Sequence, residues 1–339
     1  MITFIITIIS KYFLTFITAI IVFTLLVVIH EFGHFIMARL SGVKVEEFAI
    51  GMGPKIWGYQ AKETLYSVRA FPLGGFCKML GEDESNQDPR AFNNKPILKR
   101  IAIIAFGPIM NLILALLIFS LVFANVPIIS GVSENSPASK AGIVAGDKIV
   151  DINGTTITEW EQMRTIINES KGKEIALTFQ RNGETKQVRL IPISSEGQEG
   201  AIIGVSSSIA YKGFSISQGF KDTSNITSEM IKFLGQLFTG KASMQYVEGP
   251  VKIVKRLGEA AKVGTALVLQ FAGFLSLNLC IINLLPFPAL DGGRLVFLII
   301  EAIRRKPVDP QKEGLVHFIG FVLLMMLSVF IIYKDIITL

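Results

Sequence analysis

Two histidines and a glutamate within five consecutive residues are the first feature of the sequence that could do chemistry. The segment His30–His34 reads His-Glu-Phe-Gly-His and follows an uncharged apolar run from Tyr12 to Ile29. Residues four apart lie on one face of a helix, so both imidazoles can reach a single ion. The intervening Glu31 can accept a proton from a water molecule beside that ion. This spacing is typical of zinc sites that hydrolyse peptide bonds.

A third ligand must come from elsewhere in the chain, because catalytic zinc takes three protein ligands and leaves one position for water. His317, the remaining histidine of the sequence, is predicted to pack within the last apolar segment. Asp291 is the better candidate, since Pro286 and Pro288 break an apolar segment just before it. Its carboxylate would then lie on irregular backbone at membrane depth, which is tolerated only where that backbone lines a cavity.

The composition predicts that these residues lie in a lipid bilayer. Of the 339 residues, 50% are hydrophobic and only 18% are charged. A cleaved signal peptide is not expected, because Lys11 follows the apolar start and no small-residue cleavage site ends the run. Four uncharged segments are each long enough to cross the bilayer: Tyr12–Ile29, Ile101–Ile129, Val263–Leu290 and Leu315–Tyr333.

The distribution of Lys and Arg predicts the orientation of these spans. Basic residues concentrate between the first and second spans and in the loop between the third and fourth. Both segments are therefore predicted to be cytoplasmic, with both termini and the segment between spans two and three outside. The same residues explain the net charge of +6 without a nucleic-acid partner. The two cysteines, Cys77 and Cys280, are predicted to be reduced packing residues.

The segment Val45–Met79 has alternating stretches punctuated by Gly and Pro, which predicts β-hairpins between the first two spans. Two interpretations stay open. The segment is a cytoplasmic loop with a small sheet, or a sheet that dips toward the metal and pairs its edge with an extended substrate. Residues Glu82–Arg90 are predicted to be an acidic, solvated linker. Asn111, within the second span, is predicted to be a polar packing residue.

Residues 126–207 are predicted to form a soluble α+β domain. Thr158 and Glu161 suggest a capping box for a helix through Ile167, and Asn182-Gly183 is a strong hairpin turn. The order of strand, helix and hairpin resembles a bacterial PDZ domain. Such a domain either captures an extended segment or a C-terminus at its sheet edge, or only restricts access to the site.

The rest of the chain completes four predicted parts. Residues 1–125 are the first half of the membrane domain, 126–207 the PDZ-like domain, and 263–339 the second half of the membrane domain. Residues 208–262, which include the break at Glu248-Gly249-Pro250, are predicted to contain an amphipathic helix on the outer membrane face.

Taken together, the motifs resemble those of the site-2 protease family, in particular its bacterial regulator-of-sigma-factor protease branch. The resemblance covers most of the chain in one order. Some relatives carry two PDZ-like inserts where this chain has one. The motifs that carry it are His30–His34, Gly51–Pro54, Pro72–Gly75, the PDZ-like insert, Glu248–Pro250, and Asn283–Gly292 with its sequence Asn-Leu-Leu-Pro-Phe-Pro-Ala-Leu-Asp-Gly.

The resemblance implies Zn²⁺ held by His30, His34 and Asp291, with Glu31 as general base. It implies an intramembrane zinc metalloprotease of a bacterial cell membrane, whose substrates are single-pass transmembrane proteins such as anti-sigma factors or remnant signal peptides. It further implies that Asn278 and Asn283 help to position the substrate backbone. Gly51, Met52, Gly53 and Pro54 would belong to a membrane-dipping hairpin.

The expected fold is therefore an α-helical polytopic membrane protein with four transmembrane helices, a membrane-associated β-hairpin region and an inserted α+β PDZ-like domain. Two other functions compete with proteolysis. A non-catalytic PDZ-bearing membrane scaffold would have no need of Glu31, since structural zinc sites are closed by four ligands. A metal transporter would need more polar residues along the other spans than the sequence provides.

Overall fold

The computed structural model describes residues 2–82, 86–194, 200–306 and 308–338. The chain divides into two compact units. The helical unit comprises Met1–Ser120, Ser215–Lys262 and Val268–Leu339, and the inserted unit comprises Leu121–Phe214 with Val263–Leu267. Residues 126 and 207, where the sequence suggested domain boundaries, both fall inside strands of the inserted unit.

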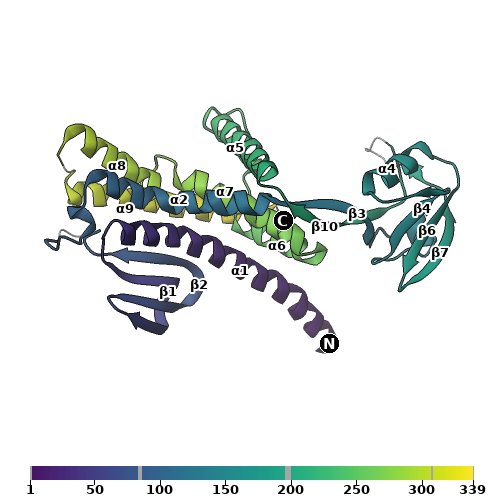
Figure 1. Cartoon of the computed structure of the whole chain (residues 1–339), viewed down its shortest axis with the longest axis horizontal. Helices are drawn as coiled ribbons and strands as arrows, with labels where there is room; N and C mark the ends of the chain where they lie inside the picture. The colour runs from purple at the N-terminus through teal and green to yellow at the C-terminus, as the bar shows by residue number, and fades with distance from the viewer. Residues whose placement is uncertain (1, 83–85, 195–199, 307, 339) are drawn as a thin grey trace. The chain divides into compact units, whose positions relative to one another are not determined.

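Long apolar helices make up most of the helical unit (Figure 1). Within the described residues, four of them are long and apolar enough to cross a membrane, over Phe13–Leu40, Ile97–Phe119, Thr265–Asn283 and Gln311–Ile337. Each of the four apolar segments predicted from the sequence overlaps one of these helices. Two predicted ends were wrong: Ile101–Ile129 is helical only to Phe119 and then enters a strand at Leu121, and Val263–Leu290 is helical only to Asn283. The helices of this part are α1 (Ile2–Leu40), α2 (Ile97–Phe119), α7 (Thr265–Asn283), α8 (Asp291–Arg304) and α9 (Pro310–Ile337).

Helices α1 and α2 approach each other closely at Gly33. A Cβ atom on Gly33 would lie 2.2 Å from the main-chain oxygen of Phe106, so only glycine permits this contact. Close to this contact, Ala38 of α1 packs with Ile103 and Ile104 of α2 in one buried apolar cluster. The glycine of the His30–His34 segment therefore sets how near α2 comes to the two histidines.

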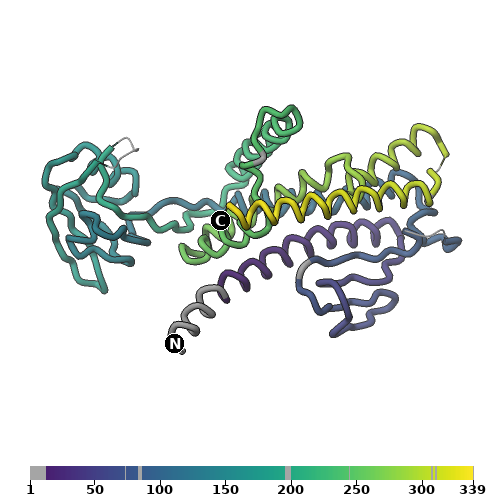
Figure 2. The backbone as a smooth tube through the Cα atoms, turned by 180° about the vertical axis from the view of Figure 1, so that it is seen from behind, coloured from purple at the N-terminus to yellow at the C-terminus, as the bar shows by residue number. Residues whose placement is uncertain are grey.

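Strands β1 (Val45–Ala61) and β2 (Thr64–Met79) follow α1 and form an antiparallel hairpin that folds back on itself, so that Glu47–Ile50 lies between Leu65–Val68 and Gly75–Lys78. It lies beside the C-terminal half of α1 in both views (Figures 1 and 2). The Thr24 hydroxyl of α1 donates to the main-chain oxygen of Pro72. The aromatic rings of Phe35, Phe48 and Tyr66 pack edge to face between the helix and the hairpin. These contacts fix β2 against the helix that carries the histidines.

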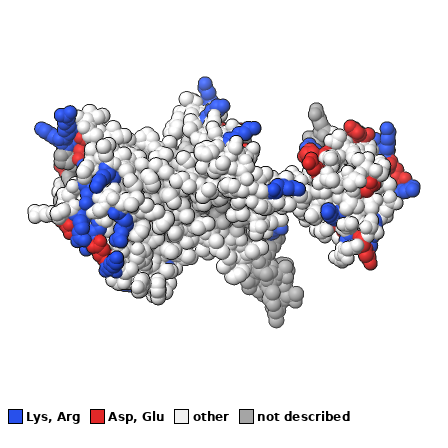
Figure 3. Space-filling view, in the orientation of Figure 1, with Lys and Arg blue, Asp and Glu red and all other residues white. Residues whose placement is uncertain are grey.

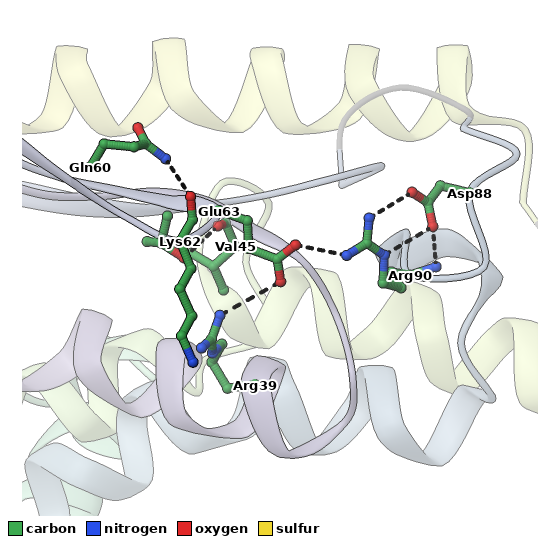
Figure 4. A network of polar contacts seen from close by, with 8 residues as sticks. Arg39, Val45, Gln60, Lys62, Glu63, Asp88 and Arg90 are labelled. Carbon is green, nitrogen blue, oxygen red and sulfur yellow. Dashed lines mark hydrogen bonds and ion pairs between the residues drawn. The ribbon is translucent and has the colours of Figure 1, made fainter.

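A polar network secures the turn of this hairpin (Figure 4). The Glu63 carboxylate lies 3.8 Å from the guanidinium of Arg39, at the end of α1, and 2.7 Å from that of Arg90. Arg90 also pairs with Asp88 at 3.3 Å. These side chains are partly exposed to solvent, which weakens each ion pair, so the network mainly orients the turn.

The inserted unit is built on a sheet with strand order β10-β3-β4-β6-β7. Its buried core includes Ile149, Met163, Leu177 and Phe179, which join the sheet to helix α4. Its elements are β3 (Leu121–Val132), α3 (Pro137–Lys140), β4 (Lys148–Ile152), β5 (Thr155–Thr156), α4 (Trp160–Glu169), β6 (Ile175–Arg181), β7 (Glu184–Leu190), β8 (Ile193–Ser194), β9 (Ala201–Ile202) and β10 (Val205–Phe214).

Of the two local features predicted for this unit, the hairpin turn is confirmed and the helix cap is not. The predicted turn at Asn182-Gly183 is confirmed, because both residues have positive φ and join β6 to β7. The predicted capping box of Thr158 and Glu161 was wrong. Glu159 caps α4 instead, and its main-chain N–H donates to Gln162 at 3.2 Å. A glutamine three residues after the cap serves as well as the expected glutamate, and it shifted the start of the helix by one residue.

Two amphipathic helices, α5 (Ile216–Phe238) and α6 (Pro250–Val263), complete the helical unit, together with the short 3-10 helices η1 (Phe92–Asn94) and η2 (Met244–Tyr246). The buried Asp335 of α9 accepts hydrogen bonds from the main-chain N–H groups of Gly249 and Lys252, at 3.2 and 3.1 Å. A Cβ atom on Gly249 would lie 2.4 Å from Ile331. The Glu248–Pro250 segment thus attaches the start of α6 to α9.

Candidate metal centre

His30 and His34 lie on one face of α1, as the four-residue spacing requires, and both are buried. Helix α2 forms the wall behind them. Nδ1 of His34 lies 2.9 Å from the main-chain oxygen of Ile103, so this nitrogen carries the proton and donates. Nε2 then carries no proton, and its lone pair is available to an ion. Gly107 leaves the space that the His34 ring occupies, since a Cβ atom added at Gly107 would lie 2.3 Å from Nε2 of His34.

Asp291 reaches the same place from the other half of the helical unit. It is the first residue of α8, so the expectation that it lies on irregular backbone was wrong; the irregular segment, residues 284–290, ends just before it. Gly292 and Gly293 make the tight return possible. Their Cβ atoms would lie 2.1 Å from the Leu285 carbonyl oxygen and 2.4 Å from that of Phe287.

The three side chains converge on one point. Oδ2 of Asp291 lies 3.1 Å from Nε2 of His30 and 3.6 Å from Nε2 of His34, and the two Nε2 atoms are 3.2 Å apart. Ligand atoms at 2.0–2.2 Å from a tetrahedral ion stand about 3.3–3.6 Å from one another. The separations, and a donor set of two imidazoles and a carboxylate, therefore fit zinc.

Glu31 and these three residues line one cavity of about 430 Å³. Strand β2 passes directly beside Glu31, because a Cβ atom on Gly75 would lie 3.7 Å from its Cγ. A carboxylate next to a three-ligand site with an open position is the arrangement required for activating water. The full lining is His30, Glu31, His34, Phe76, Cys77, Lys78, Met79, Glu82, Ile104, Asp291 and Arg294.

Sequence reasoning missed Glu82 and Arg294 as part of this cavity. Glu82, assigned to a solvated linker, is instead only 15% exposed and pairs with the guanidinium of Arg294. The prediction of a solvated linker was wrong at Glu82. Its partner lies 212 positions further along the chain, so no local pattern in the sequence indicates the pair. The proximity of Arg294 to Asp291 in the sequence was the available signal.

The other predicted site residues lie outside the described lining of this cavity. Asn278 and Asn283 lie on α7 and are partly buried, and neither belongs to the described lining of the cavity. The segment Gly51–Pro54 lies at the register shift of the hairpin, and it too is outside that lining. The part of the hairpin that does reach Glu31 is the later portion of β2, around Gly75.

The model of peptidase family M50 matches residues 18–327 of this chain. A protein of Clostridium acetobutylicum is 44% identical, over 96% of this chain and 98% of the relative. "Zinc metalloprotease RasP" of Geobacillus kaustophilus is 33% identical, over 94% of this chain and 97% of the relative. "Regulator of sigma-W protease RasP" of Bacillus subtilis is 32% identical, over 95% of this chain and 98% of the relative.

Among solved structures, the PDZ domain of the SdrC-like protein from Listeria monocytogenes is similar to part of the chain. The match covers 26% of this chain and 90% of that domain, with 18% identity and a TM-score of 0.23.

Proposed function

This chain belongs to peptidase family M50, and from that premise we propose that it cleaves single-pass membrane proteins within their transmembrane segments. The family and its relatives make the chain a zinc metalloprotease of the membrane. The single observation that carries the proposal is the shared cavity, in which Glu31 lies beside His30, His34 and Asp291.

In the proposed mechanism His30, His34 and Asp291 hold the zinc ion. Zinc held by these residues would lower the pKa of a water molecule and polarise the scissile carbonyl. Glu31 accepts the proton of the attacking water and then transfers it to the leaving amine. Both histidines are buried, and the end of β2 lines the same cavity as Glu31.

A transmembrane substrate hides its peptide groups in its own helix, so it must unwind before attack. We assign this task to Gly51, Met52, Gly53 and Pro54 of the hairpin, with Asn278 and Asn283. In its favour, Lys55–Ala61, directly after Gly51–Pro54, pairs only with Thr64–Arg69 among the described strands, so its other edge is unpaired. Met52 is 53% exposed at the register shift, where Gly51 and Gly53 have positive φ. An exposed strand edge can take over the backbone hydrogen bonds of an unwound peptide.

The substrates proposed are anti-sigma factors and remnant signal peptides, which present a single span. The name of the Bacillus subtilis relative refers to regulation of a sigma factor, and this supports the first class. The inserted unit is proposed to act as a PDZ-like domain. Strand β10 is an outer strand of its described sheet, so capture of an extended segment at that edge and simple steric gating both stay available.

We further propose that both termini and the PDZ-like domain are extracytoplasmic, with the active site toward the cytoplasmic side. Figure 3 supports this orientation, since Lys and Arg gather at the end of the helical unit where α2 begins and α8 meets α9. The residues there are Lys95, Lys99, Arg100, Arg304 and Arg305. Cytoplasmic loops carry such an excess of basic residues.

The test is Glu31→Gln in the full-length protein, purified in detergent with a single-pass test substrate. Zinc content should be unchanged, while the cleavage rate should fall by about 10²- to 10⁴-fold, the usual contribution of a general base. Glu63→Gln, in the exposed turn of the hairpin, is the matched control and should cleave normally. Cleavage by Glu31→Gln at the wild-type rate would refute the mechanism.

A further inference from the structure

Three residues of α2, spaced four apart, meet the two histidines of α1. They are Ile103, Gly107 and Asn111, which lie on one face of that helix. Ile103 supplies a main-chain acceptor for His34, and Gly107 supplies the space for both rings. Asn111 is the member of this row whose side chain is polar, and the mechanism above gives it no role.

Asn111 contacts the second nitrogen of His30. Its amide lies 3.4 Å from Nδ1 of His30, and the residue is fully buried. Its Oδ1 atom has no hydrogen-bond partner in the described part of the chain. A half-turn of the amide exchanges its oxygen and nitrogen, so either atom can be presented to Nδ1. An amide in this position can therefore accept a hydrogen bond from the ring.

His30 needs such an acceptor if its Nε2 is to hold an ion. Nε2 faces Asp291 and His34, so the proton of the neutral ring must be on Nδ1. Metal-bound histidines almost always donate this proton to a fixed oxygen, which sets the orientation of the ring and the affinity for the metal. We propose that Asn111 is the positioning residue for His30, and that its Oδ1 accepts the Nδ1 proton.

The location of Asn111 suits this role better than simple packing. Its main-chain oxygen accepts a hydrogen bond from the buried Ser276 of α7 at 2.8 Å, a contact that does not involve the side-chain amide. The two histidines thus depend on different kinds of acceptor. His34 uses a main-chain oxygen that no substitution removes, whereas His30 depends on a side chain. Only the second can be tested directly by mutation.

The inference rests on the proposed role of His30 as a zinc ligand, so the experiment measures zinc binding and not only cleavage. Full-length variants in detergent are titrated with Zn²⁺ against a competing chelator. Asn111→Leu, which cannot accept a hydrogen bond, should weaken zinc binding about 10- to 100-fold. Asn111→Asp, which keeps an acceptor, should bind zinc within about threefold of wild type.

Two controls separate the possible causes. Ser276→Ala removes the neighbouring buried hydroxyl without touching the ring, and its zinc affinity should be unchanged. Thermal unfolding in excess chelator reports on the fold alone, where Asn111→Leu should match wild type. Wild-type zinc affinity in Asn111→Leu would overturn the inference. The inference would also be overturned if both Asn111 variants lost zinc affinity equally and unfolded at a lower temperature in excess chelator. Asn111 would then be a packing residue.

His30→Ala distinguishes this inference from the proposed function. Loss of zinc from His30→Ala, with normal binding in Asn111→Leu, would overturn the role of Asn111 and leave the metal centre intact. Full zinc retention by His30→Ala would overturn the metal centre itself, and the inference with it.

Discussion

Nδ1 of His317, on α9, accepts a hydrogen bond of 2.8 Å from the main-chain N–H of Ala289. Ala289 has a φ of +74°, a left-handed conformation that a residue with a Cβ atom adopts only when its surroundings impose it. One turn further along α9, a Cβ atom on Gly320 would lie 2.4 Å from Pro288. Helix α9 thus holds the turn that delivers Asp291, and His317 has a specific polar contact besides the packing role predicted for it.

Replacing His317 by Leu should weaken both zinc binding and cleavage. The Ala289 N–H would lose its acceptor. Ala289 is exposed, so the loss is that of a net hydrogen bond, about 0.5–1.5 kcal/mol, and the turn should become free to move. We expect about a tenfold loss in zinc affinity. Phe318→Leu, at the adjacent exposed position, is the control and should behave as wild type. Identical zinc affinities for the two variants would contradict this account of the turn.

Glu82 and Arg294 should couple the end of β2 to α8. Glu82→Ala removes a charged hydrogen bond, so the amides of residues 76–82 should exchange with deuterium faster in hydrogen-exchange mass spectrometry. Because Arg294 is 35% exposed, the coupling should be about 1 kcal/mol in a double-mutant cycle. The charge-reversed pair Glu82→Arg with Arg294→Glu should recover part of the protection. If each single variant leaves exchange unchanged, the pair has no such role.

Gly107→Ala should abolish the metal centre without unfolding the protein. The added methyl group would lie 2.3 Å from Nε2 of His34, so the ring must leave its position. We expect loss of stoichiometric zinc and of cleavage, measured by metal analysis and by a single-pass substrate. Gly235→Ala in α5 is the matched helical control, because its Cβ meets no atom within 4 Å. It should be neutral or slightly stabilising.

The inserted unit should lose stability in acid through Asp147. Burial alone would raise the pKa of Asp147, but hydrogen bonds from Arg181 and the Val144 N–H, with the charge of Arg181, hold that pKa below its usual value. A carboxylate with a lowered folded-state pKa stabilises the fold above its unfolded pKa. That contribution is lost as the pH falls below about 4 toward the folded value.

Asp147→Asn should therefore destabilise the inserted unit by about 2 kcal/mol at neutral pH, the contribution of a hydrogen bond to a charged group. The difference in free energy of unfolding between Asp147→Asn and wild type should become smaller as the pH falls below about 4. Hydrogen exchange of the β4 and β6 amides in the full-length protein measures this stability difference. Asp151→Asn, at a half-buried position of the same strand, controls for the loss of one charge. If the stability difference between the two proteins stayed constant from pH 7 to pH 3, titration of Asp147 would not be its cause.

The sequence alone determined the parts of this protein whose signals are local. The four-residue spacing of His30 and His34 follows from the helical period, and the uncharged segments follow from the thickness of a bilayer. The turn at Asn182-Gly183 follows from the few residues that adopt positive φ cheaply. The selection of Asp291 over His317 also came from the sequence, through the prolines before it, and the structure places its carboxylate beside both histidines.

Only the tertiary structure decided which groups support those residues. The acceptor for His34 is 69 positions away, the amide at His30 is 81 away, and the partner of Glu82 is 212 away. Contacts between residues so far apart produce no periodic pattern in the sequence, because each depends on how closely two helices, or a helix and a strand, approach each other. That approach is set by glycines such as Gly33 and Gly107, whose missing side chains acquire a meaning only once the neighbouring helix is in place.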